Sequence, residues 1–118
     1  MPLETFIRRV REEPGRIEFA ETIGLIESLY DFRPTAFSNG DVANAAGENS
    51  GSCKVFAFAR RHELTEEQTL ACFGSYYRLD VLQRPDASDH RNIRQFMKTG
   101  WAGVSFEGDP LVPRDPAG

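Results

Sequence analysis

Residues 44–60 read Asn44-Ala-Ala-Gly-Glu-Asn-Ser-Gly-Ser-Cys53-Lys54-Val-Phe-Ala-Phe-Ala-Arg60. The first half of this stretch is small and polar, whereas the second half is apolar and carries two phenylalanines. This change predicts a loop over 44–52 that leads into a helix over 53–62. That helix is apolar on most of its surface, and such helices are usually buried. Because the first N–H groups of a helix lack partners within it, the junction is the best candidate binding site in the chain.

Amphipathic helices are predicted on both sides of this stretch. Apolar residues recur at helical spacing over 3–13 and over 17–31, with charged residues on the opposite faces. After the central helix, Thr65 and Gln68 have the spacing of a capping box. This box predicts a long fourth helix that runs from Thr65 to about residue 83.

A fifth helix is predicted near the C-terminal end. Ser88 is its expected N-terminal cap and Gly100 its expected stop, because serine favours the first position and glycine the position after the last turn. Its apolar face would comprise Ile93, Phe96 and Met97. Trp101 follows directly and is expected to anchor the last strand against the helices.

A small β-sheet completes the predicted fold. Asn39-Gly40 predicts the turn of a hairpin over 35–44, since both residues tolerate positive φ. Two short strands need further cover to be stable, and the expected third strand is 104–107. The predicted class is therefore α+β, with about five α-helices packed around a small antiparallel sheet.

The composition predicts one domain. Of the 118 residues 40% are hydrophobic, including nine Phe and one Trp, which is enough for a single core. We place the domain at 3–108. Residues 109–118 are rich in proline and are expected to form an extended or mobile tail.

The net charge and the lengths of the apolar runs argue against several classes of protein. A net charge of −4 argues against nucleic acid as a partner, because such binders usually carry a basic face. The chain has no apolar run of about 18 residues, so no membrane span is expected. Arg8 and Arg9 interrupt the first apolar stretch, and we therefore expect no secretory signal.

The cysteines and histidines do not predict a metal site. The separations of Cys53 from His62 and of Cys72 from His90 lack the paired short spacing of structural zinc sites. Two cysteines among apolar neighbours are expected to be reduced thiols, with Cys72 in the core. His62 is expected to complement the dipole at a helix end. We predict no metal and no cofactor.

The start of the central helix is the first candidate binding segment. Free N–H groups and the helix dipole attract anions there, and Lys54 adds a positive charge. The same field would stabilise a Cys53 thiolate, lower the pKa of Cys53 and raise its reactivity. The alternative is a helix well capped by Ser50 or Ser52, with Cys53 as a packing residue. The candidate ligand-binding residues here are Asn49, Ser50, Gly51, Ser52 and Lys54.

A second candidate segment lies at the start of the fifth helix. Arg91 and Arg94 are three residues apart and can together grip a carboxylate or a phosphate. His90 stands beside them. A solvated helix face is the alternative interpretation. In the fourth helix, Tyr76 and Arg78 are expected to flank a cleft.

Long blocks of the chain resemble the HopJ family of bacterial proteins over roughly residues 3–107. The blocks are Tyr30-Asp-Phe, Thr35-Ala-Phe-Ser-Asn-Gly, Asn44-Ala-Ala-Gly-Glu-Asn-Ser-Gly-Ser-Cys-Lys, Thr69-Leu-Ala-Cys-Phe-Gly-Ser-Tyr-Tyr-Arg78, Asp89-His-Arg-Asn-Ile-Arg-Gln-Phe-Met97 and Gly100-Trp-Ala-Gly. The family takes its name from a plant-pathogen protein delivered by type III secretion. The resemblance implies an effector label and translocation into host cells. It does not imply an established enzyme activity, cofactor or catalytic residue. We otherwise expect the protein in the bacterial cytoplasm.

These observations lead to three hypotheses. The first is a small soluble protein in which 44–54 and 90–94 face one cleft that binds a small anionic ligand or an acidic segment of a protein partner. The second is an enzyme with Cys53 as nucleophile and His90 as base, which requires the two side chains within hydrogen-bond distance. The third is an interaction module that packs on itself as a dimer.

Overall fold

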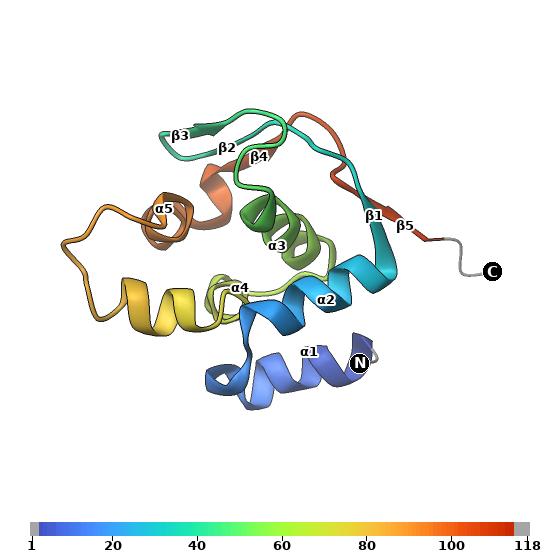
Figure 1. The fold of residues 1–118 in the computed structure, drawn as a ribbon, viewed down its shortest axis with the longest axis horizontal. Helices are drawn as coiled ribbons and strands as arrows, with labels where there is room; N and C mark the ends of the chain where they lie inside the picture. Colours follow the sequence, from blue (N-terminus) through green and yellow to red (C-terminus); the bar gives the residue numbers. More distant parts are fainter. Residues whose placement is uncertain (1–2, 115–118) are drawn as a thin grey trace.

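The computed structural model describes residues 3–114 and has the predicted α+β architecture (Figure 1). Within this range, helices pack around two small antiparallel sheets. The elements η1 and η3 are 3₁₀ turns, and η2 is a short π-helical segment. In chain order the elements are α1 (Leu3–Glu12), η1 (Pro14–Arg16), α2 (Phe19–Leu29), β1 (Tyr30–Phe32), β2 (Phe37–Asn39), β3 (Val42–Asn44), α3 (Ser50–Arg61), α4 (Glu66–Ala71), η2 (Tyr76–Val81), α5 (Arg91–Thr99), η3 (Gly100–Gly103), β4 (Val104–Phe106) and β5 (Leu111–Pro113).

The three-stranded sheet has the order β3-β2-β4, so the predicted hairpin and third strand are confirmed. The turn, however, lies one residue later than predicted, at Gly40 and Asp41. Gly40 has a φ of +56°, whereas Asn39 is the last residue of β2 and is buried. The turn is displaced because the Asn39 side chain is held in the core, where it donates a hydrogen bond to the carbonyl of Asn92.

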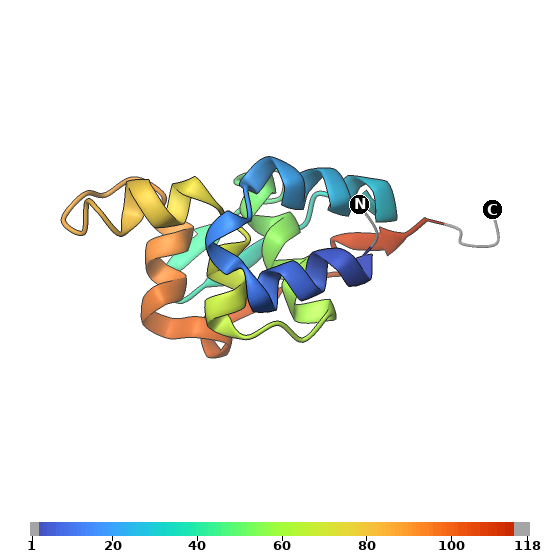
Figure 2. The same cartoon turned by 90° about the horizontal axis from the view of Figure 1, so that it is seen from below.

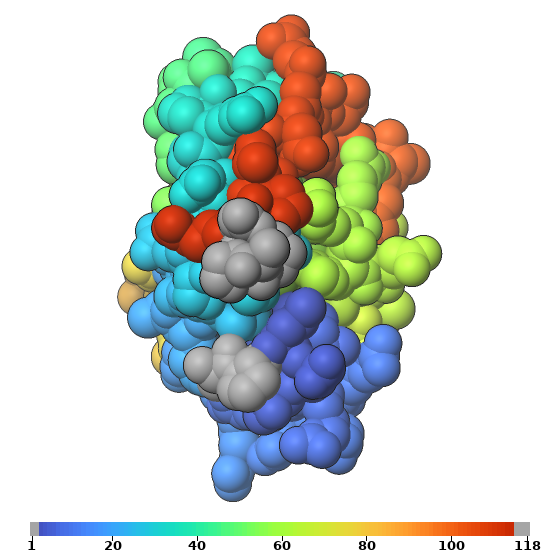
Figure 3. All heavy atoms as spheres, turned by 90° about the vertical axis from the view of Figure 1, so that its right-hand side faces the viewer, coloured from blue at the N-terminus to red at the C-terminus, as the bar shows by residue number. Residues whose placement is uncertain are grey.

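The second sheet was not predicted. In it β1 pairs antiparallel with β5, and Asp31 lies opposite Val112. Figure 3 shows β5 beside β1 on one face of the molecule. The buried side chain of Leu111 fixes this pairing, so part of the expected tail 109–118 is a strand. Residues 115–118 lie outside the described part of the chain.

Helix α3 is the centre of the core, as the apolar half of residues 44–60 predicts. It lies between the three-stranded sheet and the helices α1, α2 and α4 (Figures 1 and 2). The Phe56 ring is fully buried, with the ring of Phe96 at a centroid distance of 4.9 Å and that of Phe73 at 5.4 Å. Trp101 packs on Phe96 and donates its ring N–H to the carbonyl of Leu64, which confirms its anchoring role.

The predicted fourth helix is broken. Helix α4 begins with the predicted Thr65–Gln68 capping box but ends at Ala71, and the π-helical η2 follows as a separate element. The break is at Gly74, where φ is +61° and an added Cβ would lie 2.5 Å from the backbone N of Phe19. Close approach to the start of α2 therefore ends the helix, and η2 lies next to α5 (Figure 1).

Helix α5 also differs from its prediction. It begins at Arg91 after His90, whose side chain forms no capping hydrogen bond, so the predicted Ser88 cap is wrong. Gly100 ends the helix as predicted, with a φ of +58°. Ile93 and Phe96 are buried, but Met97 is 45% exposed because it lies on the side of the helix that faces solvent.

None of the helices in residues 3–114 combines the length and the apolar composition that a bilayer crossing requires.

Candidate functional site

A cleft of about 550 Å³ lies where α3 and α5 begin. We call it the α3–α5 cleft. One wall is formed by the β3–α3 loop with the first turn of α3, and the other by residues 88–93. The two segments singled out from the sequence thus meet in one depression, although about 40 residues separate them along the chain. The volume is within the range of small-molecule sites, roughly 300–1,000 Å³.

The floor of the cleft is aromatic. Phe19 stacks on Phe73 at a centroid distance of 6.2 Å, and its edge meets Tyr76 at 5.1 Å. The first turn of α3 closes on Phe19 at Gly51, where a Cβ would lie 2.9 Å from the ring. A side chain at this position would therefore require the Phe19 ring to shift, and the cleft pairs an apolar floor with the polar ends of two helices.

Both helices begin without a side-chain cap at the cleft. Asn49 and His90 precede α3 and α5 with left-handed φ values of 50° and 51°, and neither forms a capping hydrogen bond. No acidic residue lies in either first turn. Within residues 3–114, the backbone N–H groups of two tripeptides form no hydrogen bond. These are Ser50, Gly51 and Ser52 in α3, and Arg91, Asn92 and Ile93 in α5.

Asparagine side chains tie the two helix starts together. The Oδ1 atom of Asn44 accepts hydrogen bonds from Asn49 Nδ2 at 2.7 Å and from Asn92 Nδ2 at 3.0 Å. Asn39 extends the network through its bond to the Asn92 carbonyl. Asn39, Asn44 and Asn92 are buried, and buried amide networks hold their members in one geometry.

Sequence reasoning missed the roles of Asn39, Asn44 and Asn92. A usable signal was present, because asparagine is depleted in strands and yet Asn39 and Asn44 end the two strands of the hairpin. An amide in such a position indicates a specific buried partner. In this chain that partner is the start of α5.

His90 is held at the edge of the cleft by two contacts from η2. Its Nε2 atom is 3.0 Å from Asp80 Oδ2, and its ring lies over Tyr76 at a centroid distance of 5.1 Å. The sequence predicts that Tyr76 flanks a cleft together with Arg78; Tyr76 lines the α3–α5 cleft, whereas Arg78 does not. The two contacts fix the orientation of the imidazole relative to the N–H groups of α5.

The charged side chains of the cleft are not all positive. Arg91 is exposed and forms no ion pair with the described residues. Asp89 also lines the cleft, but its carboxylate is 2.7 Å from Arg94 Nη2, and this bond lowers the pKa of Asp89. The carboxylate of Glu48 accepts the backbone N–H of Ala45 at 2.7 Å. Both carboxylates thus have partners, whereas Arg91 is available for a ligand.

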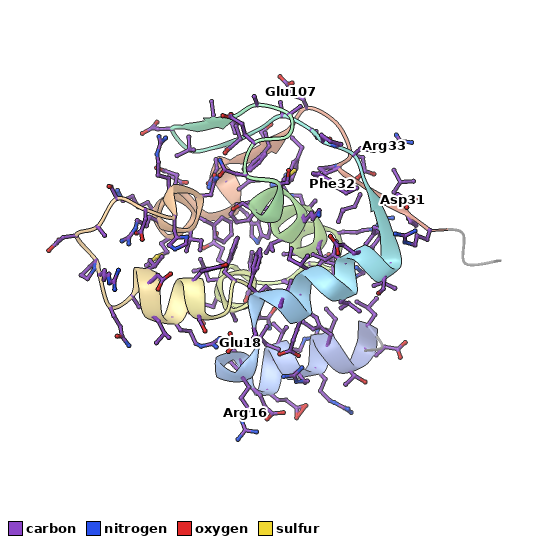
Figure 4. The ribbon with its side chains drawn as sticks, viewed as in Figure 1. Arg16, Glu18, Asp31, Phe32, Arg33 and Glu107 are labelled. Carbon is purple, nitrogen blue, oxygen red and sulfur yellow. The ribbon has the colours of Figure 1, made fainter. Side chains whose placement is uncertain are left out.

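Three predicted site cations lie outside the cleft and are engaged elsewhere. Lys54 points away from Ser52 because two residues turn a helix by about 200°; its Nζ is 3.1 Å from Glu27 and 4.9 Å from the Phe32 ring centroid. Arg78 donates to the carbonyl of Ile17 at 2.6 Å and pairs with Glu18, which Figure 4 labels at the start of α2.

The third, Arg94, lies outside the cleft for a similar reason. Its guanidinium donates to the carbonyls of Asp89 and Arg84 at 2.6 and 2.9 Å, besides its bond to the Asp89 carboxylate. Arg94 therefore holds the segment that precedes α5 against the first turn of that helix. Of the predicted arginine pair, Arg91 alone lines the cleft.

Cys53 faces the core and not the cleft. Its side chain is buried, with Sγ 3.8 Å from the carbonyl oxygen of Thr35. Burial raises the pKa of Cys53 to about 11, so the expected lowering is wrong. His90 lines the cleft and Cys53 does not, which leaves the thiol without the base that a nucleophile needs.

The other cysteine and histidine have structural positions. Cys72 is a free buried thiol, and burial raises its pKa to about 12. The Nε2 atom of His62 is 2.7 Å from the hydroxyl of Tyr30, and burial lowers the pKa of His62. Both side chains stabilise the packing around α3.

The fold and the cleft define a small α+β protein with a ligand-sized cleft at two helix starts. The sequence model of the family described as HopJ type III effector protein matches residues 3–111. The chain therefore belongs to the HopJ type III effector family, as the resemblance predicts.

A solved structure has the same fold. It is described as the crystal structure of unknown function protein VPA0580, is 50% identical to this chain and superposes with a TM-score of 0.95. The similarity covers 97% of this chain and 95% of that one. No curated protein matches the chain.

Proposed function

We propose that this effector-family protein acts by binding a small anionic ligand in the α3–α5 cleft. One observation carries the proposal: two helices begin at the same cleft with unbonded N–H groups and no acidic side chain in either first turn. The positive ends of two helix dipoles then act on one volume, which favours a negative group there. Arg91 supplies a full positive charge beside them.

The aromatic floor of the cleft favours a ligand that also has an apolar part. Phe19 and Phe73 offer an apolar surface next to the N–H groups, and Tyr76 closes one side. An aromatic ring with a carboxylate or phosphate would satisfy both parts at once, because aromatic side chains bury apolar area and helix starts bind oxyanions. We therefore take small aromatic carboxylates and phosphates as the ligand class.

Family membership supports a further proposal about location. We infer that the protein is delivered into a host cell by type III secretion. A reporter fused to the C-terminus should reach host cells from a strain with an intact secretion apparatus. It should stay in the bacteria when that apparatus is disabled, and equal transfer from both strains would contradict this inference.

Titration calorimetry with inorganic phosphate and with benzoate tests the binding proposal. Arg91→Gln should weaken binding about tenfold, because it removes one charge-assisted contact. Ser52→Asp should weaken it further, since its carboxylate would occupy the start of α3. Gln68→Glu is the matched control: it adds the same charge at the same position of the first turn of α4, away from the cleft.

The results separate specific binding from general charge effects. Binding that weakens with Ser52→Asp and not with Gln68→Glu supports the cleft. A wild-type protein that binds neither probe, or an equal loss in both variants, would overturn the proposal. Thermal melting confirms that each variant is folded before it is titrated.

A further inference from the structure

Exposed apolar side chains gather on one part of the surface. Within residues 3–114, the large apolar residues that are most exposed are Leu79 at 51%, Leu82 at 48%, Met97 at 45% and Tyr76 at 43%. All belong to η2, to the residue after it, or to α5, and these elements pack against each other. Such gathering differs from the isolated exposed leucines of ordinary surfaces and is typical of interaction sites.

A hollow of about 240 Å³ lies in this patch, and we call it the η2–α5 hollow. Leu82 and Met97 line it, and the buried side chain of Val81 lies at its base. Pro85 and Ala87 complete the apolar wall. The hollow does not share these residues with the α3–α5 cleft, so it is a separate site.

The charges near the hollow are mainly positive. Lys98 lines it and Arg84 precedes Pro85, and neither forms an ion pair with the part of the chain that the structure describes. Arg94 also lines it, but its charge is paired with Asp89. Asp86, on the other side of Pro85, likewise forms no ion pair with the described residues and offsets the charge of Arg84. The unpaired Lys98 and the paired Arg94, both in the wall of this apolar hollow in a chain of net charge −4, favour a partner that is both apolar and acidic.

We propose that the η2–α5 hollow binds an amphipathic acidic segment of a partner protein. An apolar anchor of that segment enters between Leu82 and Met97, and its acidic residues pair with Lys98. Concavity favours insertion of a side chain over contact with a flat lipid surface. The net negative charge of the chain also disfavours an anionic membrane.

Synthetic helical peptides provide the probe. One carries leucines on one face and glutamates on its flanks, and two matched peptides replace either the leucines by serine or the glutamates by lysine. Fluorescence anisotropy of labelled peptides with the full chain should show binding of the first peptide. The serine peptide should lose it, because the apolar anchor supplies most of the affinity.

Variants of the protein locate the site. Leu82→Ser should weaken binding about tenfold, because it removes one apolar contact of an interface anchor. Leu79→Ser is the matched control, since Leu79 is an equally exposed leucine of the same region that does not line the hollow. Lys98→Glu should weaken binding, whereas Arg8→Glu, an exposed charge on α1, should not.

Several results would overturn the proposal. No binding of the glutamate peptide, equal binding of the lysine peptide, or equal effects of Leu82→Ser and Leu79→Ser would each do so. Sedimentation to phosphatidylserine vesicles without peptide binding would identify a membrane surface instead. A dimer that Leu82→Ser dissolves would identify a second copy as the occupant. These measurements are independent of anion binding in the α3–α5 cleft.

Discussion

The starts of helices α2, α3, α4 and α5 are of two kinds. Helix α4 begins with the Thr65–Gln68 capping box, and α2 begins with a box of Glu18 and Glu21 in which the Glu21 carboxylate accepts the Glu18 N–H. Helices α3 and α5 begin after a left-handed residue whose side chain caps nothing. A left-handed residue other than glycine costs about 1–2 kcal/mol, and less for asparagine. The starts of α2 and α4 are therefore capped. The starts of α3 and α5, which meet in the cleft, are left uncapped although this lowers the stability of the fold.

The charged residues in the first helical turns differ in the same way between the capped and the uncapped helices. Glu21 and Glu66 place carboxylates in the first turns of α2 and α4, where they complement the helix dipole. The first turn of α5 carries Arg91, which has the opposite sign. A cation at the positive end of a helix lowers stability. This arrangement is understandable if an anion from solution supplies the missing negative charge.

The largest expected effect comes from Gly74, whose backbone packs against the capped start of α2. Gly74→Ala should lower the free energy of unfolding by about 3 kcal/mol or more, because it combines a strained φ with a backbone clash. Ser75 would then lose its hydrogen bond to the Glu18 carboxylate. Chemical denaturation measures the loss. Gly24→Ala is the control in an open helical position and should stabilise by up to about 1 kcal/mol; equal losses would contradict the role of Gly74.

The second prediction compares the reactivity of two thiols at the start of α3: Cys53, which faces the core, and a cysteine introduced at residue 52, which faces the cleft. The pKa of Cys53 is raised from 9.0 to about 11, so the thiolate fraction at pH 8 is about a hundredfold smaller than for an unshifted thiol. Labelling of Cys53 should be slower by at least this factor and should accelerate as pH rises. In a Cys53→Ser, Cys72→Ser background, Ser52→Cys places a thiol on the cleft side.

That introduced thiol should react faster than a free thiol, since an open helix start stabilises a thiolate. Timed reaction with a thiol reagent across pH 7 to 10, in native protein and in denaturant, gives both rates. Fast labelling of native Cys53 would contradict its inward orientation. Slow labelling of Ser52→Cys would contradict an open start at α3.

The smallest expected effect distinguishes a cap from an uncapped serine. Thr65→Ala should cost about 1 kcal/mol, because the Thr65 hydroxyl accepts the Gln68 N–H at 3.1 Å. Ser50→Ala should cost much less, since its hydroxyl donates to the Gly47 carbonyl and caps no N–H group. Urea denaturation of both variants gives the difference. A Ser50→Ala loss as large as that of Thr65→Ala would mean that α3 is capped after all.

Local patterns predicted the features that depend on neighbouring residues. The apolar run after Cys53 gave the buried α3, and the Thr65–Gln68 spacing gave the capped α4. The two segments of the cleft were also recognised, because their small polar and basic residues differ from the core around them. These features need no information about distant contacts.

The features that were missed depend on contacts across the fold. The sequence around Gly74 continues a helical pattern, and only the approach of Phe19 shows why the helix breaks there. Pairing of β1 with β5 joins distant segments. Lys54 and Arg94 carry suitable charges for the cleft, but their direction on the helix takes them to other partners.

Backbone amide shifts during a phosphate or benzoate titration test the central claim most directly. In ¹⁵N-labelled protein, the amides of Gly51, Ser52, Asn92 and Ile93 should shift together and saturate with one dissociation constant. Those of Glu67 and Gln68, at the capped start of α4, should not follow. Absence of saturable shifts at the cleft, or equal shifts at both kinds of helix start, would contradict the assignment of the α3–α5 cleft as an anion site.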